Sequence, residues 1–286
     1  MARMEFVPAL TLVKKAVAKG YAVPSFCAWD AESIAVVLRG AAKARAPVML
    51  MMGPSEFGVL RPMEMARIAK ALAADYDIPV ALHLDHAEDL ELVNECLEAR
   101  YTSVMLDYST RPFAENAAAL RQTVEWAHPR GVTVEGEIGH VGKVDGATLE
   151  GGAQSALTDP ASAKALVQET GLDMLAVSIG NAHGLYTKLP QFDFKLLEQL
   201  ARDTGVPLVL HGGSGTPRAD LRRAIALGIG KVNVASELVH GYRKTLMAQW
   251  QAGQNLWTPC ALPSACACVA EVVERWFEMT GAAGQA

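Results

Sequence analysis

Short apolar runs alternate with longer segments in which apolar residues recur at helical spacing, and the alternation continues along most of the chain. Runs such as Pro79–Leu84 have the length and unbroken hydrophobicity of strands that are buried on both faces of a parallel sheet. The pattern predicts eight strands, at residues 22–27, 47–52, 79–84, 103–107, 132–137, 172–179, 207–210 and 231–235.

Helical segments lie between these strands, and several carry start signals. Asp30 and Asp159 are placed to cap helices, and Pro62 suits a first helical turn. The spacing predicts helices at residues 10–18, 30–45, 62–76, 89–100, 112–128, 159–170, 193–204, 217–227, 237–251 and 264–279. Between residues 139 and 152, five glycines and little periodicity predict a mobile loop.

A strand–helix repeat of about thirty residues requires parallel strands, and eight such strands close into a (β/α)₈ barrel. We therefore expect an α/β protein with a TIM barrel, an extra N-terminal helix and a C-terminal helical extension. No composition break marks a boundary, so residues 1–286 are predicted to form a single barrel domain. The alternative is an open doubly wound sheet. That fold usually carries a glycine-rich turn after its first strand, and Phe26–Asp30 contains no glycine.

Composition narrows the class of protein. Hydrophobic residues make up 51% and charged residues 20%, which favours a compact globule. The net charge of -5 provides no basic surface for nucleic acid, although a local pocket for a phosphorylated metabolite remains compatible with it. Residues 1–8 lack the apolar core of a signal peptide, and no run reaches the ~18 apolar residues of a membrane span. Five scattered cysteines indicate reduced thiols, so we expect a cytoplasmic protein without membrane contact.

Polar residues follow six of the predicted strands. In a barrel the carboxyl ends of all strands converge on one face, so residues that are distant in sequence meet there. The polar strand ends are Asp85 and His86, Asp107, Glu137, His183, His211 and Asn233. Asp85 or His86 could instead cap the next helix, and the histidines could be separate residues satisfied by backbone carbonyls.

Three of these residues, His86, His183 and His211, come from three different strands. Three neutral imidazoles with an open position are a common arrangement for catalytic zinc, and Glu137 could be a fourth or alternative ligand. We therefore predict a metal site, for Zn²⁺ or another divalent ion. His83 lies mid-strand and is expected to be a hydrogen-bonded core residue.

A glycine run after the seventh strand predicts a phosphate-binding site. Gly212, Gly213, Ser214 and Gly215 precede a helix start at Thr216 and Pro217, so several backbone N–H groups and a helix dipole are available to an anion. In a barrel this is the usual position of a phosphate site. Gly180, Asn233 and Ser236 are further candidates for it.

The predicted parts suggest a reaction. A divalent cation can polarise a ketone and stabilise the enediolate that forms when a bond to its α-carbon is cleaved. Asp85 is placed to move the proton of the hydroxyl on the aldehyde half. Asp145, at the centre of the predicted loop, could supply a second acid or base.

Several motifs resemble those of the class II, zinc-dependent ketose-bisphosphate aldolases, which include fructose-1,6-bisphosphate and tagatose-1,6-bisphosphate aldolases. The resemblance runs nearly from end to end, from Ala22–Phe26 to Gly281–Gln285. The most specific segments are Leu82–His86, Glu135–Gly139, Ser178–Tyr186, Leu210–Gly215 and Lys231–Ala235.

The resemblance implies roles for particular residues. Zinc would be bound by His86, His183 and His211, with Glu137 as an alternate ligand, and Asp85 would donate a proton to the aldehyde oxygen. Asp145 would replace a loop glutamate that moves the α-carbon proton. Five further residues would hold dihydroxyacetone phosphate: Gly184, Gly212, Ser214, Asn233 and Ser236. A monovalent cation (Na⁺ or K⁺) often lies nearby, and the family is commonly dimeric or tetrameric, so a homodimer or homotetramer is expected.

Three departures from the family pattern concern the substrate. Asp107-Tyr108-Ser109 stands where the family usually has Asp-Gly-Ser. Trp257–Cys260 lacks the arginine of a frequent Asp-Pro-Arg, and Cys27 replaces a frequent asparagine. Losing an arginine–phosphate contact weakens phosphate binding.

These departures leave three hypotheses for the function. The first is reversible cleavage of a ketose 1,6-bisphosphate to dihydroxyacetone phosphate and glyceraldehyde 3-phosphate. The second keeps this donor and uses a non-phosphorylated or acidic aldehyde. The third is a non-catalytic subunit that binds a sugar phosphate or activates another aldolase.

Overall fold

Eight parallel strands form a closed barrel in which each strand pairs with its neighbours in chain order and β8 pairs with β1. The computed structural model describes residues 5–142, 156–186 and 189–286. The strands are β1 Val23–Cys27, β2 Val48–Met52, β3 Val80–Ala87, β4 Ser103–Leu106, β5 Thr133–Ile138, β6 Met174–Val177, β7 Leu208–Leu210 and β8 Ile229–Val234. The predicted (β/α)₈ barrel is therefore confirmed, and the open sheet is excluded.

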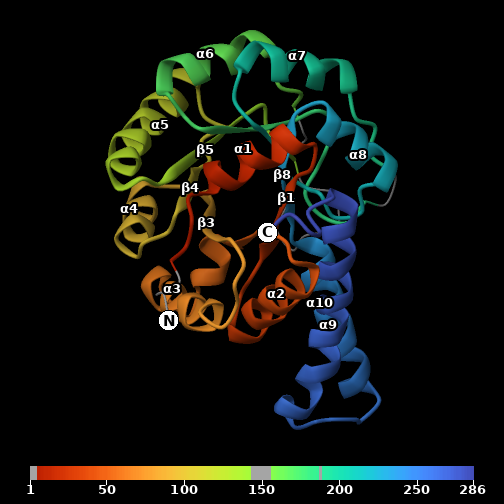
Figure 1. Cartoon of the computed structure of the whole chain (residues 1–286). Coiled ribbons are helices and arrows are strands. Elements are labelled where there is room, and N and C mark those ends of the chain that lie inside the picture. Colours follow the sequence, from red (N-terminus) through yellow and green to blue (C-terminus); the bar gives the residue numbers. More distant parts are fainter. Residues whose placement is uncertain (1–4, 143–155, 187–188) are drawn as a thin grey trace.

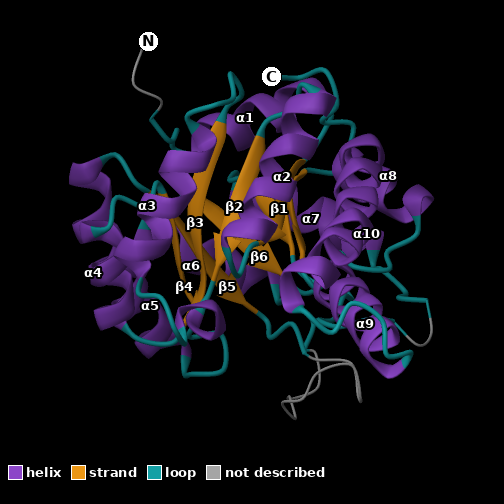
Figure 2. Cartoon of the chain, turned by 90° about the horizontal axis from the view of Figure 1, so that it is seen from below, coloured by secondary structure: helices purple, strands orange, loops and turns teal. Residues whose placement is uncertain are grey.

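Helices surround the barrel on its outer side (Figures 1 and 2). They are α1 Ala9–Lys19, α2 Ala31–Ala44, α3 Pro62–Ala73, α4 Leu90–Glu98, α5 Phe113–Ala127, α6 Pro160–Thr170, α7 Phe194–Thr204, α8 Arg218–Ala226, α9 Ser236–Gln251 and α10 Thr258–Thr280, with 3₁₀ turns η1 Pro54–Phe57 and η2 His128–Arg130. Asp30 and Asp159 cap α2 and α6 as expected, each accepting a bond from a backbone N–H. None of the described helices combines the length and hydrophobicity that a membrane-spanning segment needs.

The strands are apolar because they are enclosed from both sides. Every residue of β1, β2, β4, β6, β7 and β8 is buried, between the barrel interior and the ring of helices. Continuous burial explains why the strands read as unbroken apolar runs rather than as alternating patterns. The few charged residues inside this core are consequently costly to bury and must be paired.

The extra N-terminal helix α1 lies across the amino-terminal end of the barrel (Figure 1). Before the helix, the backbone N–H of Val7 donates to the carbonyl oxygen of Val80 over 2.9 Å. Within it, the N–H of Leu10 donates to Oγ1 of Thr133 over 3.0 Å. These bonds attach α1 to β3 and β5 and close this end, so the opposite, carboxyl end is the one available to a ligand.

The C-terminal helices α9 and α10 pack against each other and extend beyond the ring of helices (Figure 1). The prediction that the last helix begins near residue 264 was wrong, because α10 begins at Thr258. Pro259 occupies its first turn, where the backbone N–H would have no partner within the helix and its loss costs nothing. Pro263 follows within the helix. From the sequence, two closely spaced prolines predict that no helix runs through them. In the structure only Pro263 removes a hydrogen bond within the helix.

The far end of α10 is anchored to the barrel. Phe277 is fully buried, and its ring meets the ring of Phe26 on β1 edge to face at 5.4 Å between centroids. Such aromatic pairs add to the stability that burial itself contributes.

We predict that Phe277→Ala lowers the free energy of unfolding by about 3–5 kcal/mol, because it leaves a cavity between α10 and β1. Val59 is 93% exposed, so the control Val59→Ala should change stability by no more than about 0.5 kcal/mol. Urea unfolding followed by circular dichroism measures both. Equal stability of the two variants would show that α10 is not held by this contact.

Candidate metal centre and active site

Three histidines from three strand ends meet at the carboxyl end of the barrel. His86 lies on β3, and His183 and His211 follow β6 and β7. Their ring centroids are 4.9 Å apart for His86 and His183, 4.6 Å for His86 and His211, and 5.6 Å for His183 and His211. One nitrogen of each ring is buried without a hydrogen-bond partner, namely Nε2 of His86, Nε2 of His183 and Nδ1 of His211. The hypothesis of separate, individually satisfied histidines does not fit this geometry.

The other nitrogen of each ring is held by an acceptor. Nδ1 of His86 donates to Oδ2 of Asp107 over 2.7 Å, and Nδ1 of His183 donates to the carbonyl oxygen of Val141 over 3.1 Å. Nε2 of His211 donates to Oε1 of Glu135 over 2.8 Å. Metal-ligating histidines have such partners, which fix the ring and direct the free lone pair at the ion.

Glu137 completes the donor set. Its Oε1 accepts from the N–H of Val141 over 3.1 Å, while Oε2 is buried without a partner 3.4 Å from Nδ1 of His211. Burial raises the pKa of the Glu137 carboxyl to about 8, and the charge on Asp107 adds to the effect. A carboxylate in this position is therefore unfavourable by itself and would be stabilised by a cation.

The four unpartnered atoms fit a divalent cation. The ligand nitrogens of His86, His183 and His211 lie within 4.8 Å of one another. Buried polar atoms are almost always satisfied, so orphans gathered at one point indicate a missing partner. Three imidazoles with a carboxylate oxygen beside them form a donor set that zinc accepts, and they suit a site that keeps a position open.

The charges near His86 also favour a cation. Burial by itself would lower the pKa of this imidazole, but Asp85 and the bond to Asp107 outweigh burial and raise the pKa to about 10. Burial lowers the pKa of His183 to about 3, helped by the charge of His86. The surrounding carboxylates thus stabilise one positive charge in the cluster. A bound cation would take the place of the proton on His86.

A local kink brings two consecutive residues of β3 into the site. His86 has a φ of 46°, and the pairing of β3 with β4 shifts register between Leu84 and Ala87. The predicted alternative, in which Asp85 or His86 caps the following helix, is wrong. The cap of α4 is Asp89, whose carboxylate accepts from the N–H of Leu92 over 2.8 Å.

Asp85 lies beside the histidine cluster and is held in place from β8. Its Oδ1 accepts from Nδ2 of Asn233 over 2.9 Å, and its Oδ2 is 3.9 Å from Nε2 of His86. Burial would raise the pKa of Asp85, but the neighbouring His86 and His83 hold it well below its ordinary value. Asp85 is therefore a fixed carboxylate next to the candidate ion site.

A charged layer lies beneath the histidines. Nζ of Lys231, a fully buried residue on β8, donates to Oε2 of Glu135 over 2.9 Å and to Nε2 of His83 over 3.2 Å. Nδ1 of His83 bonds with Oγ of Ser103 over 2.8 Å, which makes His83 the hydrogen-bonded core residue that we expected. Burial would raise the pKa of Glu135, but Lys231 and His211 lower it to about 2.

The sequence reading missed Glu135 and Lys231, although a signal was available. His83 and Asp85, Glu135 and Glu137, and Lys231 and Asn233 are each two residues apart on one strand. Residues two apart point to the same side of a strand, so each residue at the rim has a polar neighbour one layer deeper in the barrel.

The glycine loop after β7 folds against the start of α9. Oγ of Ser214 accepts from the N–H of Glu237 over 3.2 Å, and the N–H of Gly215 donates to Oε1 of Glu237 over 2.9 Å. Gly213 donates to the carbonyl oxygen of Asn233 over 3.0 Å. The predicted phosphate residues Gly212, Gly213, Ser214, Asn233 and Ser236 therefore come together where β7 and β8 end, beside the first turn of α9.

A second link holds this loop to the segment that carries His183. The hydroxyl of Tyr186 donates to the carbonyl oxygen of Gly212 and accepts from the N–H of Ala182, both over 3.0 Å. Gly212 has a φ of 63°, and a Cβ there would clash with the carbonyl oxygen of Ala182. Gly180 and Gly184, the remaining glycine candidates, flank His183 in the same segment.

Of the other residues singled out in the sequence, Ser109 and Tyr108 can be placed and Asp145 cannot. The N–H of Ser109 donates to Oδ1 of Asp107 over 3.0 Å, so Ser109 orients the acid that holds His86. Tyr108 contacts Arg111, whose guanidinium carbon lies 4.3 Å from the ring centroid. Asp145 and most of the predicted loop lie outside the described residues.

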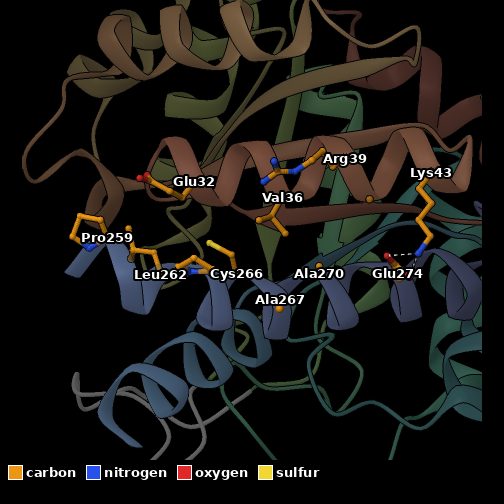
Figure 3. A pocket seen from close by; sticks show the side chains of 12 residues that line it. Glu32, Val36, Arg39, Lys43, Pro259, Leu262, Cys266, Ala267, Ala270 and Glu274 are labelled. Carbon is orange, nitrogen blue, oxygen red and sulfur yellow. Dashed lines mark hydrogen bonds and ion pairs between the residues drawn. The ribbon is translucent and has the colours of Figure 1, made fainter. Parts of the chain in front are cut away.

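A groove of about 540 Å³ lies apart from this centre, on the outer side of the barrel between α2 and α10 (Figure 3). Its floor is apolar, and the ion pair of Lys43 and Glu274, 2.8 Å apart, lies at one end. None of the candidate site residues lines it.

Comparison with known proteins identifies the family. A family model described as fructose-bisphosphate aldolase class-II matches residues 7–285. The chain belongs to this family. As a member of this family, the chain is a carbon–carbon lyase. Class II aldolases are generally metal-dependent, and the chain has candidate metal ligands at the end of its barrel.

Solved structures of aldolases superpose on almost the whole chain. The YdjI aldolase of Escherichia coli K12 is 29% identical, with a TM-score of 0.86 over 99% of this chain and 100% of that one. A candidate fructose-1,6-bisphosphate aldolase of Coccidioides immitis is 30% identical, with a TM-score of 0.86 over 97% of each chain. The fructose-bisphosphate aldolase of Campylobacter jejuni, 20% identical, shares the fold with a TM-score of 0.83 over 100% of this chain and 98% of that one.

For this aldolase we predict that Asp107→Asn weakens zinc binding about 10- to 100-fold, because His86 loses the carboxylate that orients it. Titration against a chromogenic chelator measures the affinity. Asp173 forms a similar pair with His128 over 3.0 Å, on the surface. Asp173→Asn should leave zinc affinity unchanged, and equal effects of both substitutions would contradict the role of Asp107.

We also predict that Lys231→Met destabilises the aldolase by about 3–5 kcal/mol, because it leaves Glu135 as an uncompensated buried charge. The exposed pair of Lys43 and Glu274 provides the control, and Lys43→Met should cost less than about 1 kcal/mol. Guanidinium unfolding of the metal-free protein measures both. A loss below that of the control would exclude a structural charge pair inside the barrel.

Proposed function

We propose that this aldolase reversibly cleaves a ketose 1-phosphate into dihydroxyacetone phosphate and an aldehyde. The reaction uses a bound divalent cation, for which Zn²⁺ is the first candidate. The observation that carries the proposal is the convergence of three unpartnered imidazole nitrogens beside the Asp85 carboxylate. The family supports aldol cleavage as the reaction class.

The ion would be held by His86, His183 and His211, with Glu137 as an alternative ligand. When bound, a divalent cation polarises a ketone oxygen and stabilises the negative charge that develops on it during carbon–carbon cleavage. Asp107, Glu135 and the carbonyl of Val141 keep the three rings directed at the ion.

Asp85 would handle the proton of the hydroxyl on the aldehyde carbon. In the cleavage direction its carboxylate accepts that proton, and in the condensation direction it returns the proton to the aldehyde oxygen. The bond from Asn233 fixes one carboxylate oxygen and leaves Oδ2 on the side of His86. Asp145 stays a candidate for the proton on the α-carbon.

The phosphate of the donor half would bind where the β7 loop meets α9. Gly212, Gly213, Ser214 and Ser236 lie there. The N–H of Gly213 is bonded to Asn233, and the start of α9 at Ser236 is favourable for an anion. Gly184, beside His183, and Asn233, beside Asp85, would contact the carbon chain between the phosphate and the ion.

Two candidates remain for the aldehyde. The name of the family supports glyceraldehyde 3-phosphate, and hence a ketose 1,6-bisphosphate of the fructose or tagatose type, as substrate. An aldehyde without phosphate is supported by the absence of an arginine from Trp257–Cys260. The hypothesis of a non-catalytic subunit loses its support, because the chain belongs to a lyase family.

We predict that complete chelation abolishes cleavage, that Zn²⁺ restores it, and that Asp85→Asn lowers kcat at least about 100-fold while the zinc content is retained. Release of dihydroxyacetone phosphate from fructose and tagatose 1,6-bisphosphates, and its condensation with a panel of aldehydes, measure activity. Asp89→Asn, which keeps a helix cap, is the control and should be fully active. Undiminished activity after complete metal removal would exclude the proposal.

A further inference from the structure

The strand ends show where the aldehyde half of the substrate must lie. The candidate ion site uses β3, β5, β6 and β7, through His86, Glu137, His183 and His211, and the candidate phosphate site uses the ends of β7 and β8. These sites leave the ends of β1, β2 and β4, and the end of β4 is occupied by Asp107, which holds His86. The ends of β1 and β2 lie between β8 and β3, which carries Asp85, so the far end of a ketose bound at both sites would face them.

Cys27 and Glu56 occupy this open part of the rim. Cys27 is the last residue of β1, and Glu56 lies in η1, directly after β2. The thiol of Cys27 donates to Oε1 of Glu56 over 3.5 Å, and the N–H of Gly53 donates to Oε2 over 2.8 Å. Glu56 is the acceptor in both hydrogen bonds, as its carboxylate form can be.

At Gly53 the Glu56 carboxylate and the backbone of Asp85 approach the same point. A Cβ placed on Gly53 would be 2.8 Å from the carbonyl oxygen of Asp85 and 3.4 Å from Oε2 of Glu56. Burial raises the pKa of Cys27 well above its ordinary value, and the charges of Glu56 and Asp85 add to the effect. The three groups therefore form one acidic wall with a protonated thiol.

Within the described part of the chain, the Glu56 carboxylate has no cationic partner. Glu56 forms no ion pair with a lysine or arginine among residues 5–142, 156–186 and 189–286. Across the described chain, Arg61 is the nearest basic residue in sequence, and it points to solvent with 80% of its side chain exposed. A second phosphate arriving here would meet carboxylates instead of a cation.

We propose that Glu56, with Cys27, determines specificity for the aldehyde half and selects an uncharged, hydroxyl-bearing aldehyde over a phosphorylated or carboxylated one. The inference rests on the proposed function, because it assumes that the ion and the donor phosphate bind as described above. A sugar hydroxyl can donate to a carboxylate oxygen, and an uncharged chain adds no repulsion. An anion in the same place is repelled, and more strongly than in water, because the site is partly enclosed.

Glu56 also has a structural role that must be separated from specificity. It closes a capping box with Gly53 at the start of η1. Glu64 does the same at the start of α3, where its Oε2 accepts from the N–H of Arg61 over 2.8 Å. The Glu64 side chain is 39% exposed and lies away from the site, so Glu64→Gln is a matched control for the loss of a capping charge.

The test uses zinc-loaded enzyme and condensation of dihydroxyacetone phosphate with two matched aldehydes, glyceraldehyde and glyceraldehyde 3-phosphate. We expect wild type to favour glyceraldehyde at least tenfold in kcat/KM. Glu56→Gln keeps the size and a capping oxygen but removes the charge, and should shift the ratio at least tenfold toward the phosphorylated aldehyde. The KM of dihydroxyacetone phosphate should not change, and Glu64→Gln should behave as wild type.

The outcomes distinguish the two levels of the argument. Condensation with either aldehyde but an unchanged ratio in Glu56→Gln would overturn the specificity role and leave the proposed function standing. A wild-type preference for glyceraldehyde 3-phosphate would do the same, even if the variant did not fold. If wild type condensed dihydroxyacetone phosphate with no aldehyde, the proposed function and this inference would both fail.

Discussion

The site depends on the way each imidazole is held from behind. Asp107, Glu135 and the carbonyl of Val141 each accept from one ring nitrogen, so the remaining nitrogen of every ring is fixed in direction before any ion arrives. A ring that could rotate would offer its lone pair only part of the time, and would find other partners in a polar site. Orientation by fixed acceptors therefore matters as much as the choice of histidine itself.

Holding these acceptors requires charge deep in a barrel whose walls are apolar. Lys231 compensates Glu135 and also bonds with His83, which passes the contact on to Ser103. The interior thus changes from an apolar end closed by α1, through one compensated polar layer, to a rim with surplus acid. The unpartnered buried atoms of His86, His183, His211 and Glu137 lie at this rim, which is where a ligand would bind.

Most of the barrel and the three histidines could be predicted from the sequence, because continuous burial produces readable apolar runs and strand ends must converge. The start of α10 could not, since two closely spaced prolines indicate a break although Pro259 suits a first turn. Glu135 and Lys231 were missed because they pair with each other across 96 residues of the chain. Glu56 was missed because a glutamate shortly after a strand usually faces solvent, and only the closed barrel brings Cys27 against it.

The kink at His86 has a consequence for how this centre can change. In a regular strand, consecutive side chains point to opposite faces, so one strand end could present either an acid or an imidazole to the cavity. Positive φ at His86 and the register shift let β3 present both, with Oδ2 of Asp85 3.9 Å from Nε2 of His86. The two groups share one rigid turn of backbone. Repositioning the carboxylate would also displace the imidazole, so the two groups can change position only together.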